Sequence, residues 1–248
     1  MKKLKVKIVR LGELPFDLNY NRIKKFKSSI FEIDEEIPKL KLEDARYSGD
    51  FCTYEIDELE GQIDNKHLKE GVDFILVITN CLLKDDYYAR RLADKKAIFT
   101  FRNTRSHLEK AHIPLENAIF RILYEYCLMF DESEKNNCIR KINTWFLHHE
   151  TRKCLFDFDG VIEDIIISFN QPSICKECKQ NLEEFGISEY VIEKVEKELK
   201  KLKKTPLYRI FDWVKKYPVL SMIMSSIGMV VVNILSSLLY NSIFKCDK

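Results

Sequence analysis

The chain has 248 residues, enough for one sizeable domain with an appendage, and 46% hydrophobic with 32% charged residues suits a folded core. The formal net charge is only +2, so overall charge gives no reason to expect nucleic acid as a partner. Eight cysteines and no hydrophobic leader at the start of the sequence indicate a reducing compartment, where thiols bind metal or pack in the core.

The first half of the chain alternates between strand and helix patterns. Residues 4–11 alternate like a strand, and residues 20–31 have apolar side chains at helical spacing. The continuous apolar run at 72–79 predicts a buried central strand, and 96–102 predicts another. Pro114 then opens a helical stretch with a broad apolar face. Strands alternating with helices predict an α/β or α+β domain.

A metal-ligand pattern follows this helical stretch. Cys175 and Cys178 are separated by two residues, a spacing found both in metal sites and in redox dithiols. If the pair binds a metal, the site needs two further ligands. His149 and Cys154 lie upstream with four residues between them, so a local loop brings both to one ion. One imidazole and three thiolates predict a closed, structural zinc site, although the adjacent His148 leaves the identity of the histidine ligand open. Reduced core cysteines are the alternative, and a thioredoxin-like dithiol is less favoured.

A second motif lies between the two pairs of expected ligands. The segment 155–164, LFDFDGVIED, resembles the DxDG signature of haloacid-dehalogenase-type phosphatases, with Asp157 as nucleophile and Asp159 as general acid. That chemistry needs Mg²⁺ and further motifs on a large domain. Only about 50 residues separate the motif from the apolar end of the chain, and most of them form one charged helical pattern. We therefore interpret the two carboxylates as part of a solvated turn.

The segment 188–204 predicts a charged helix with a narrow apolar stripe. The stripe consists of Ile192, Val195, Leu199 and Leu202, spaced by three and four residues. Such a helix either lies on its own domain, which we favour, or forms a short coiled coil between subunits.

The segment 217–244 contains no charged residue and predicts a membrane-spanning helix. Its length exceeds the roughly 30 Å hydrocarbon core of a bilayer at about 1.5 Å per residue. Trp213 and Tyr217 flank one end and Tyr240 and Phe244 the other, where aromatic rings prefer the interface. A buried core helix is the alternative, but core helices of this length rarely lack charge.

The charges beside this segment predict its orientation. Only two basic residues, Lys245 and Lys248, follow the segment. Seven precede it closely: Lys200, Lys201, Lys203, Lys204, Arg209, Lys215 and Lys216. The positive-inside bias therefore places residues 1–216 in the cytoplasm and predicts a tail-anchored protein with the lipid bilayer as a partner. Small residues at Ser221, Ser225 and Gly228 also allow a homo-oligomer through close helix packing.

The order of the histidines and cysteines resembles the archaemetzincins, a family of small zinc metallopeptidases. In that family a catalytic HExxHxxGxxH motif is followed by Cys-x4-Cys and a later Cys-x-x-Cys, which hold a second, structural zinc. His148 stands where the family has its third catalytic histidine, and His149 stands where it has the first structural cysteine. The gap to Cys154 and the later cysteine pair both match. The resemblance covers about residues 4–185 and implies the α+β class, with a metzincin-like mixed sheet and helices.

The departures from the family imply that catalysis is lost. Where the resemblance expects HExxH, the chain has Tyr124 through Leu128, and only Glu125 is retained. HExxH works because histidines four residues apart grip one zinc while the glutamate polarises its water. His148 would be a lone leftover ligand, displaced by an insertion at 131–144. We therefore expect no catalytic residues, and we interpret Glu125 as a surface or helix-end carboxylate on a helix that packs in the core.

Three segments follow from this reasoning. We expect an archaemetzincin-like domain with a structural zinc site at 1–185, a charged linker helix and juxtamembrane amphipathic helix at 186–216, and a transmembrane helix at 217–244. The leading hypothesis is a membrane-anchored, catalytically inactive module for binding, sensing or effector action at the cytoplasmic face, with an unknown protein partner.

Two alternatives from other functional classes stay open. One is an active zinc peptidase with atypical ligands, using Glu125, His148 and either His107 or His112. The other is a membrane-perturbing oligomer that acts through the single span.

Overall fold

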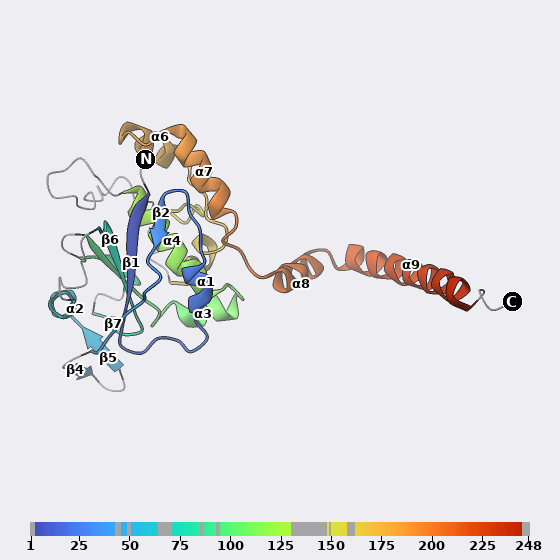
Figure 1. Cartoon of the computed structure of the whole chain (residues 1–248), viewed down its shortest axis with the longest axis horizontal. Helices are drawn as coiled ribbons and strands as arrows, with labels where there is room; N and C mark the ends of the chain where they lie inside the picture. The colour runs from blue at the N-terminus through green and yellow to red at the C-terminus, as the bar shows by residue number, and fades with distance from the viewer. Residues whose placement is uncertain are drawn as a thin grey trace. The chain divides into compact units, whose positions relative to one another are not determined.

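The structure is a computed structural model. It describes residues 3–42, 46–48, 51–63, 71–84, 87–92, 95–129, 148, 150–157 and 162–244. The chain divides into two compact units, Met1–Lys203 and Lys204–Lys248, which Figure 1 shows in colours that run from blue to red along the sequence.

The first unit is built on a mixed sheet in which the strand order is β2-β1-β6-β9-β8, with β3 also paired to β1. All pairings are parallel except that of β8 with β9. The strands are β1 (Leu4–Leu11), β2 (Phe31–Ile33), β3 (Lys39–Leu40), β6 (Phe74–Thr79), β8 (Ala89–Arg91) and β9 (Lys96–Thr100). A smaller sheet joins β4 (Arg46–Ser48), β5 (Phe51–Tyr54) and β7 (Leu82–Leu83). The α+β fold class with a mixed sheet is therefore confirmed.

The central position of β6 in the sheet explains why its sequence is a continuous apolar run. It pairs with β1 on one side and β9 on the other, and all six of its residues are buried. Phe74, Leu76 and Ile78 enter the larger core, while Ile75 and Val77 enter the smaller core on the opposite face. A strand covered on both faces has no solvent-facing position for a polar residue.

Helices cover both faces of the large sheet. Those on the larger core are α1 (Tyr20–Lys24), α3 (Arg105–Lys110), α4 (Leu115–Leu128), α5 (Ile165–Ser168), α6 (Lys176–Glu184) and α7 (Glu189–Leu199), with a short 3₁₀ helix at Ile162–Asp164 before α5. Helix α2 (Ile56–Gln62) packs on the smaller core through Leu59. In Figure 1, α1, α4 and α7 lie on one side of β1 and α2 lies on the other. Every residue of α4 is buried, as expected for a central helix.

The helical pattern expected at 20–31 is only partly correct. Helix α1 ends at Lys24, and Phe31–Ile33 forms β2 instead. The backbone N–H of Leu4 donates to the Ile30 carbonyl at 2.9 Å, which begins the pairing of β2 with β1. Tertiary pairing with a neighbouring strand thus overrides a short local helical pattern.

Helix α7 packs on its own domain rather than on a second subunit. Ile192, Val195, Leu199 and Leu202 are buried in the larger core. The compact unit accordingly extends to Lys203, so α7 is an integral part of it and not a linker beyond residue 185.

A carboxylate on α7 joins three parts of this unit. The Glu198 side chain accepts hydrogen bonds from the Tyr124 hydroxyl at 2.6 Å, the Ser28 hydroxyl at 3.0 Å and the Ser29 backbone N–H at 3.0 Å. Burial, together with the hydrogen bond to Glu198, raises the pKa of the Tyr124 hydroxyl, which therefore remains a donor at physiological pH.

We expect Tyr124→Phe to lower the free energy of unfolding by about 1.5–3 kcal/mol, because a charged acceptor loses a buried donor. Urea unfolding of the detergent-solubilised chain measures this change. Tyr190→Phe is the matched control, since Tyr190 is on α7 but is 66% exposed. Equal losses in the two variants would contradict the role given to Glu198.

The second unit consists of two helices, α8 (Pro206–Lys216) and α9 (Pro218–Phe244), joined by Tyr217. Within α9, Pro218–Tyr240 is long and apolar enough to cross a membrane. None of its most apolar stretch is buried, which separates α9 from a core helix such as α4. The C-terminal helix expected from the sequence is therefore present, and its length and exposure suggest a membrane anchor.

Candidate metal centre

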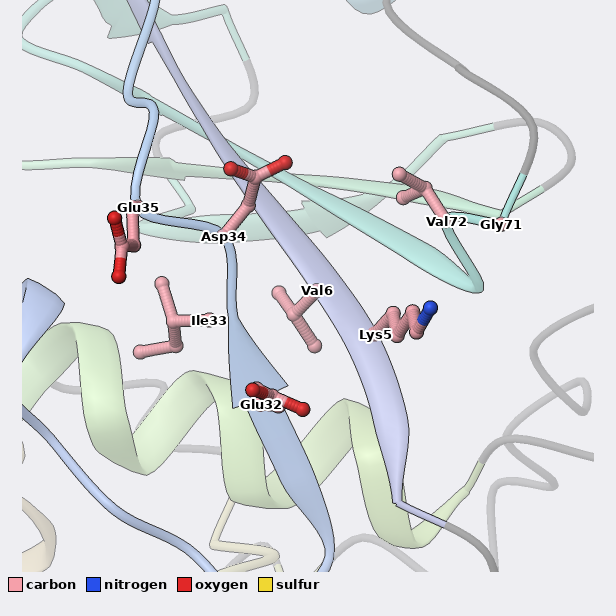
Figure 2. A pocket seen from close by; sticks show the side chains of 8 residues that line it. All are labelled: Lys5, Val6, Glu32, Ile33, Asp34, Glu35, Gly71 and Val72. Carbon is pink, nitrogen blue, oxygen red and sulfur yellow. The ribbon is translucent and has the colours of Figure 1, made fainter.

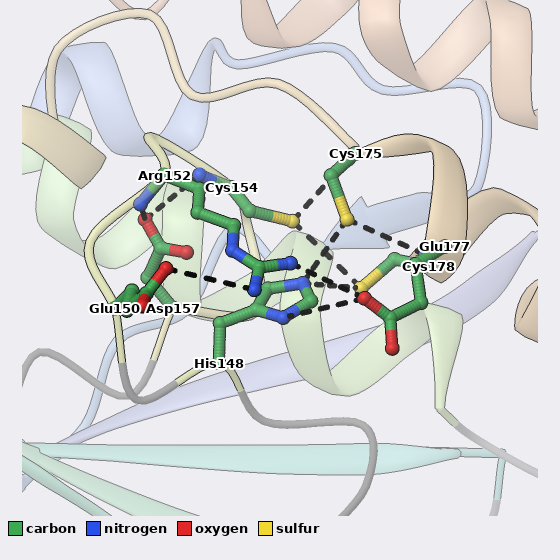
Figure 3. A network of polar contacts seen from close by, with 8 residues as sticks. All are labelled: His148, Glu150, Arg152, Cys154, Asp157, Cys175, Glu177 and Cys178. Atoms are coloured by element: carbon green, nitrogen blue, oxygen red, sulfur yellow. Dashed lines mark hydrogen bonds and ion pairs between the residues drawn. The ribbon is translucent and has the colours of Figure 1, made fainter.

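Four side chains of the first unit converge on one point, as Figure 3 shows. The Nε2 atom of His148 lies 3.0 Å from Cys175 Sγ and 3.1 Å from Cys178 Sγ. Cys154 Sγ lies 3.8 Å from Cys178 Sγ, and all four candidate ligand atoms lie within 4.8 Å of one another. Three of the residues are buried and Cys175 is half-buried.

The start of α6 positions two of the sulfurs. Cys175 is the N-cap residue of α6, and its Sγ accepts from the Cys178 backbone N–H at 3.4 Å. The Cys175 backbone N–H in turn points to Cys154 Sγ at 3.4 Å. A helix N-terminus and its free N–H groups favour negative charge, so this geometry stabilises thiolates. The Cys-x-x-Cys spacing works here because the helical turn brings Cys178 back beside its cap.

Backbone pairing connects the loop of Cys154 to the segment that leads into α6. Cys154 forms an isolated bridge with Ser173, whose N–H donates to the Lys153 carbonyl at 2.9 Å. The Leu155 N–H donates to the Ser173 carbonyl at 2.7 Å. Lys153 has a positive φ of 63°, which makes the tight turn before Cys154. These contacts hold segments about twenty residues apart in register, so the ligand set does not depend on side chains alone.

Asp157 stabilises the same turn from inside, which corrects its interpretation as a solvated carboxylate. It is buried, and its Oδ2 accepts from the backbone N–H groups of Cys154 at 2.8 Å and Arg152 at 3.0 Å. A carboxylate held by two backbone donors is a structural cap of the turn. Asp159, the second residue of the phosphatase-like motif, lies outside the described residues.

The pKa values of the three thiols shift in different directions. The hydrogen bond with Cys178 lowers the pKa of Cys154 to about 5, assisted by backbone donors and the nearby imidazole and opposed by burial. The same hydrogen bond to Cys154, together with burial, raises the pKa of Cys178. Burial raises the pKa of Cys175 as well. A divalent ion among these sulfurs would favour the thiolate form of all three.

The donor set and its spacing fit a zinc ion. Zn–S bonds of about 2.3 Å in a tetrahedron place two sulfurs about 3.8 Å apart. The Cys154–Cys178 separation equals this value at 3.8 Å. The imidazole contacts of 3.0 and 3.1 Å are shorter than the roughly 3.5 Å of an ideal site, so His148 would move outward by about 0.5 Å. One imidazole and three thiolates are a common structural zinc set.

A carboxylate lies near the second ring nitrogen of His148. Its Nδ1 lies 4.0 Å from Glu177 Oε2, and Arg152 Nη1 donates to that oxygen at 3.2 Å, as Figure 3 shows. At 4.0 Å this carboxylate lies near the imidazole without a hydrogen bond to it, and Arg152 is its nearer partner.

Three of the four predicted ligands, Cys154, Cys175 and Cys178, come together, and the fourth position in the described cluster belongs to His148. His149, which the spacing favoured, lies outside the described residues. His148 forms a bridge with Asp157, and its N–H donates to the Phe156 carbonyl at 3.3 Å. The bridge orients His148 toward the sulfurs, a choice between adjacent histidines that spacing alone does not make.

We expect His148→Ala to reduce bound zinc well below one ion per chain, and His149→Ala to leave it unchanged. The physical reason is that, among the described residues, the imidazole of His148 is the one that lies among the three sulfurs. Elemental analysis of the purified chain measures the stoichiometry, and His149→Ala is the matched control one residue away. Loss of zinc only in His149→Ala would show that the other histidine is the ligand.

Residues missed by sequence reasoning connect this site to α4. Arg121 is completely buried, and its Nη1 donates to Glu125 at 2.6 Å and to the Tyr88 hydroxyl at 3.2 Å. Its Nη2 donates to the Asp157 carbonyl at 3.0 Å, and its guanidinium lies over the Phe169 ring. Glu125 is therefore a buried, ion-paired carboxylate and not a surface one. An Arg and a Glu four residues apart within an apolar helix are the sequence signal that could have indicated this pair.

The ligand set of the alternative peptidase does not assemble in the described part of the chain. Only the His148–cysteine group meets the geometry of a metal site there. Glu125 is paired with Arg121, and His148 lies among sulfurs.

A pocket of about 420 Å³ lies elsewhere in the first unit, at the ends of β1 and β2 and beside the entry to β6 (Figure 2). It is lined by Lys5, Val6, Glu32, Ile33, Asp34, Glu35, Gly71 and Val72. This lining includes no histidine, cysteine or serine, so it provides neither a zinc ligand of the soft type nor a hydroxyl or thiol nucleophile.

No family model matches the chain, and no curated protein does. Among solved structures, the chain is similar to the crystal structure of archaemetzincin from Methanopyrus kandleri, with a TM-score of 0.41 and 14% sequence identity. The similar region covers 73% of this chain and 94% of that one. Membership of the archaemetzincin family therefore stays a prediction.

Proposed function

We propose that the protein is a membrane-anchored, non-catalytic zinc protein whose folded unit acts as a binding, sensing or effector module at the cytoplasmic face. The observation that carries this proposal is the closure of the metal site. Four protein side chains surround one point, so a tetrahedral ion bound there has no position left for water or substrate. A catalytic zinc requires such an open position, and a structural zinc does not.

The composition of α4 supports the absence of catalysis. Tyr124 and Leu128, which stand where the archaemetzincin resemblance expects zinc-binding histidines, are buried in the larger core. Glu125 is engaged by Arg121 at 2.6 Å, so its carboxylate is already committed to an ion pair. On this proposal the helix of an ancestral peptidase site has become ordinary core, while the structural zinc is retained with histidine in place of one cysteine.

The second unit supports the membrane part of the proposal. Helix α9 is apolar on all sides, with none of its most apolar stretch buried, and such a surface is stable in a lipid bilayer. The basic residues before α9 outnumber those after it, which favours a cytoplasmic location for the zinc unit. Attachment to a membrane confines a binding module to two dimensions and raises its local concentration for partners at that surface.

Zinc stoichiometry and peptide hydrolysis test the catalytic part of the proposal. We expect one zinc per chain in the wild-type protein and in Glu125→Gln, and no hydrolysis of unstructured peptides by either. A second zinc that Glu125→Gln removes, together with hydrolysis by the wild type, would establish the peptidase instead.

Protease protection in sealed vesicles tests the topology. We expect digestion of the zinc unit only when protease is on the cytoplasmic side, as detected with a tag at residue 1. Protection from cytoplasmic protease would reverse the proposed orientation while leaving the zinc assignment intact.

A further inference from the structure

Helix α8 has one fully apolar face that nothing in the described part of the second unit covers. Its apolar residues project from one side of the helix at successive angles of about 100° per residue. They are all exposed, by between 38% and 60%: Leu207, Ile210, Phe211, Trp213 and Val214. A face of five large apolar side chains on an eleven-residue helix is costly in water, so it needs an apolar environment.

The opposite face is basic. It carries Arg209, Lys215 and Lys216, and its carboxylate at Asp212 is already paired with Lys204 at 2.7 Å. Three cations therefore remain on a face whose acidic group is neutralised. A large apolar face opposite a lysine- and arginine-rich face is the pattern of helices that lie in the plane of a membrane surface.

The connection to α9 determines where this helix must lie. Helix α8 ends at Lys216 and α9 begins at Pro218, so Tyr217 alone separates them. When α9 spans a bilayer, one residue cannot carry the end of α8 further than about 7 Å from the headgroups. The end of α8 thus lies beside the start of α9, and the ring of Trp213, on the apolar face, lies 6.3 Å from that of Tyr217 at the junction.

We infer that α8 is a second membrane-binding element, which lies in the headgroup layer of the leaflet that α9 enters and binds anionic lipids through Arg209, Lys215 and Lys216. The inference rests on the proposed membrane anchor and adds a lipid class to it. Each cation near an anionic surface contributes about fivefold to partitioning, so the three together contribute on the order of a hundredfold. Helix α8 thereby responds to the charge of the membrane, which α9 does not sense because it is uncharged.

Fluorescence of Trp213 in the full chain tests this inference. The chain has two tryptophans, so Trp145→Phe leaves Trp213 as the reporter. The protein is reconstituted into vesicles of phosphatidylcholine alone or with phosphatidylserine. With phosphatidylserine, we expect strong protection of Trp213 from aqueous acrylamide and quenching by lipids brominated near the headgroup rather than near the bilayer centre. With phosphatidylcholine alone, we expect clearly weaker protection.

Two matched variants identify which face of α8 is responsible for the protection of Trp213. Ile210→Gln places an amide on the apolar face and should expose Trp213, whereas Tyr208→Gln places the same amide on the polar side and should not. Replacing Arg209, Lys215 and Lys216 together by glutamine should reduce protection in phosphatidylserine vesicles to the level seen with phosphatidylcholine.

The remaining outcomes overturn either this inference or its premise. Extraction of the chain from vesicles by alkaline carbonate would overturn the anchor itself. A chain that resists extraction but leaves Trp213 open to acrylamide would overturn the role of α8 alone. Equal protection in both vesicle types would overturn the anionic preference. Protection without any lipid quenching would show that α8 packs on protein, either a second copy or the zinc unit, and would also overturn the inference.

Discussion

Replacing Cys178 by serine is expected to abolish zinc binding and to destabilise the first unit by several kcal/mol. Cys178 is completely buried in the larger core, and its sulfur lies near both Cys154 and His148. A serine hydroxyl is a poor zinc ligand, and structural zinc stabilises small zinc domains by about 10–16 kcal/mol, so losing it leaves a large deficit. Chemical unfolding followed by circular dichroism, with zinc content measured in parallel, gives both quantities.

A substitution at a second cysteine and a zinc chelator test whether the loss of stability comes from the loss of zinc. Cys127→Ser is the matched control, because Cys127 is also buried but lies on α4 and takes no part in the cluster. It should retain one zinc per chain and lose only the smaller cost of burying a hydroxyl. A strong zinc chelator should lower the stability of the wild type and of Cys127→Ser but leave Cys178→Ser unchanged. If chelation leaves the wild type equally stable, the cysteines are ordinary core residues.

Replacing Arg121 by methionine is expected to cost about 3–5 kcal/mol of stability, because it leaves the buried Glu125 carboxylate without its cation. Arg121 has no solvent exposure, and it bonds Glu125 at 2.6 Å. The double variant Arg121→Met, Glu125→Leu should recover most of that loss, since apolar residues of similar volume replace a buried ion pair at little cost. Equilibrium unfolding of the two variants and the wild type measures the difference.

Zinc affinity separates the two roles of Arg121, which are the ion pair with Glu125 and the hydrogen bond to the Asp157 carbonyl. Both variants lose the hydrogen bond to the Asp157 carbonyl, and Asp157 caps the turn of Cys154. Both should therefore bind zinc about 10–100-fold more weakly, even though only the single variant loses the larger part of its stability. Glu125→Gln, which keeps Arg121, should bind zinc as the wild type does. Unchanged zinc affinity in both Arg121 variants would show that α4 does not position the metal centre.

Local sequence patterns were sufficient to predict a segment where its environment is the same along its whole length. Strand β6 is covered on both faces and α9 is exposed on all sides, so an unbroken apolar run identified each. The distinction between them followed from length alone, since a six-residue strand and a helix of more than twenty residues are far apart. The cysteine pair at α6 was equally readable, because its spacing is a property of a single helical turn.

By itself, the sequence determined that a mixed sheet with helices precedes a long apolar helix, and that Cys154, Cys175 and Cys178 are suited to one metal ion. Only the tertiary structure decided that His148 faces the sulfurs, and that Glu125 and Asp157 are buried parts of the scaffold. The physical reason is that the sequence around a carboxylate or an imidazole looks the same whether that side chain lies in water or in a core. Its role is set by partners distant in the chain, such as Cys175 for the imidazole of His148, 27 residues apart.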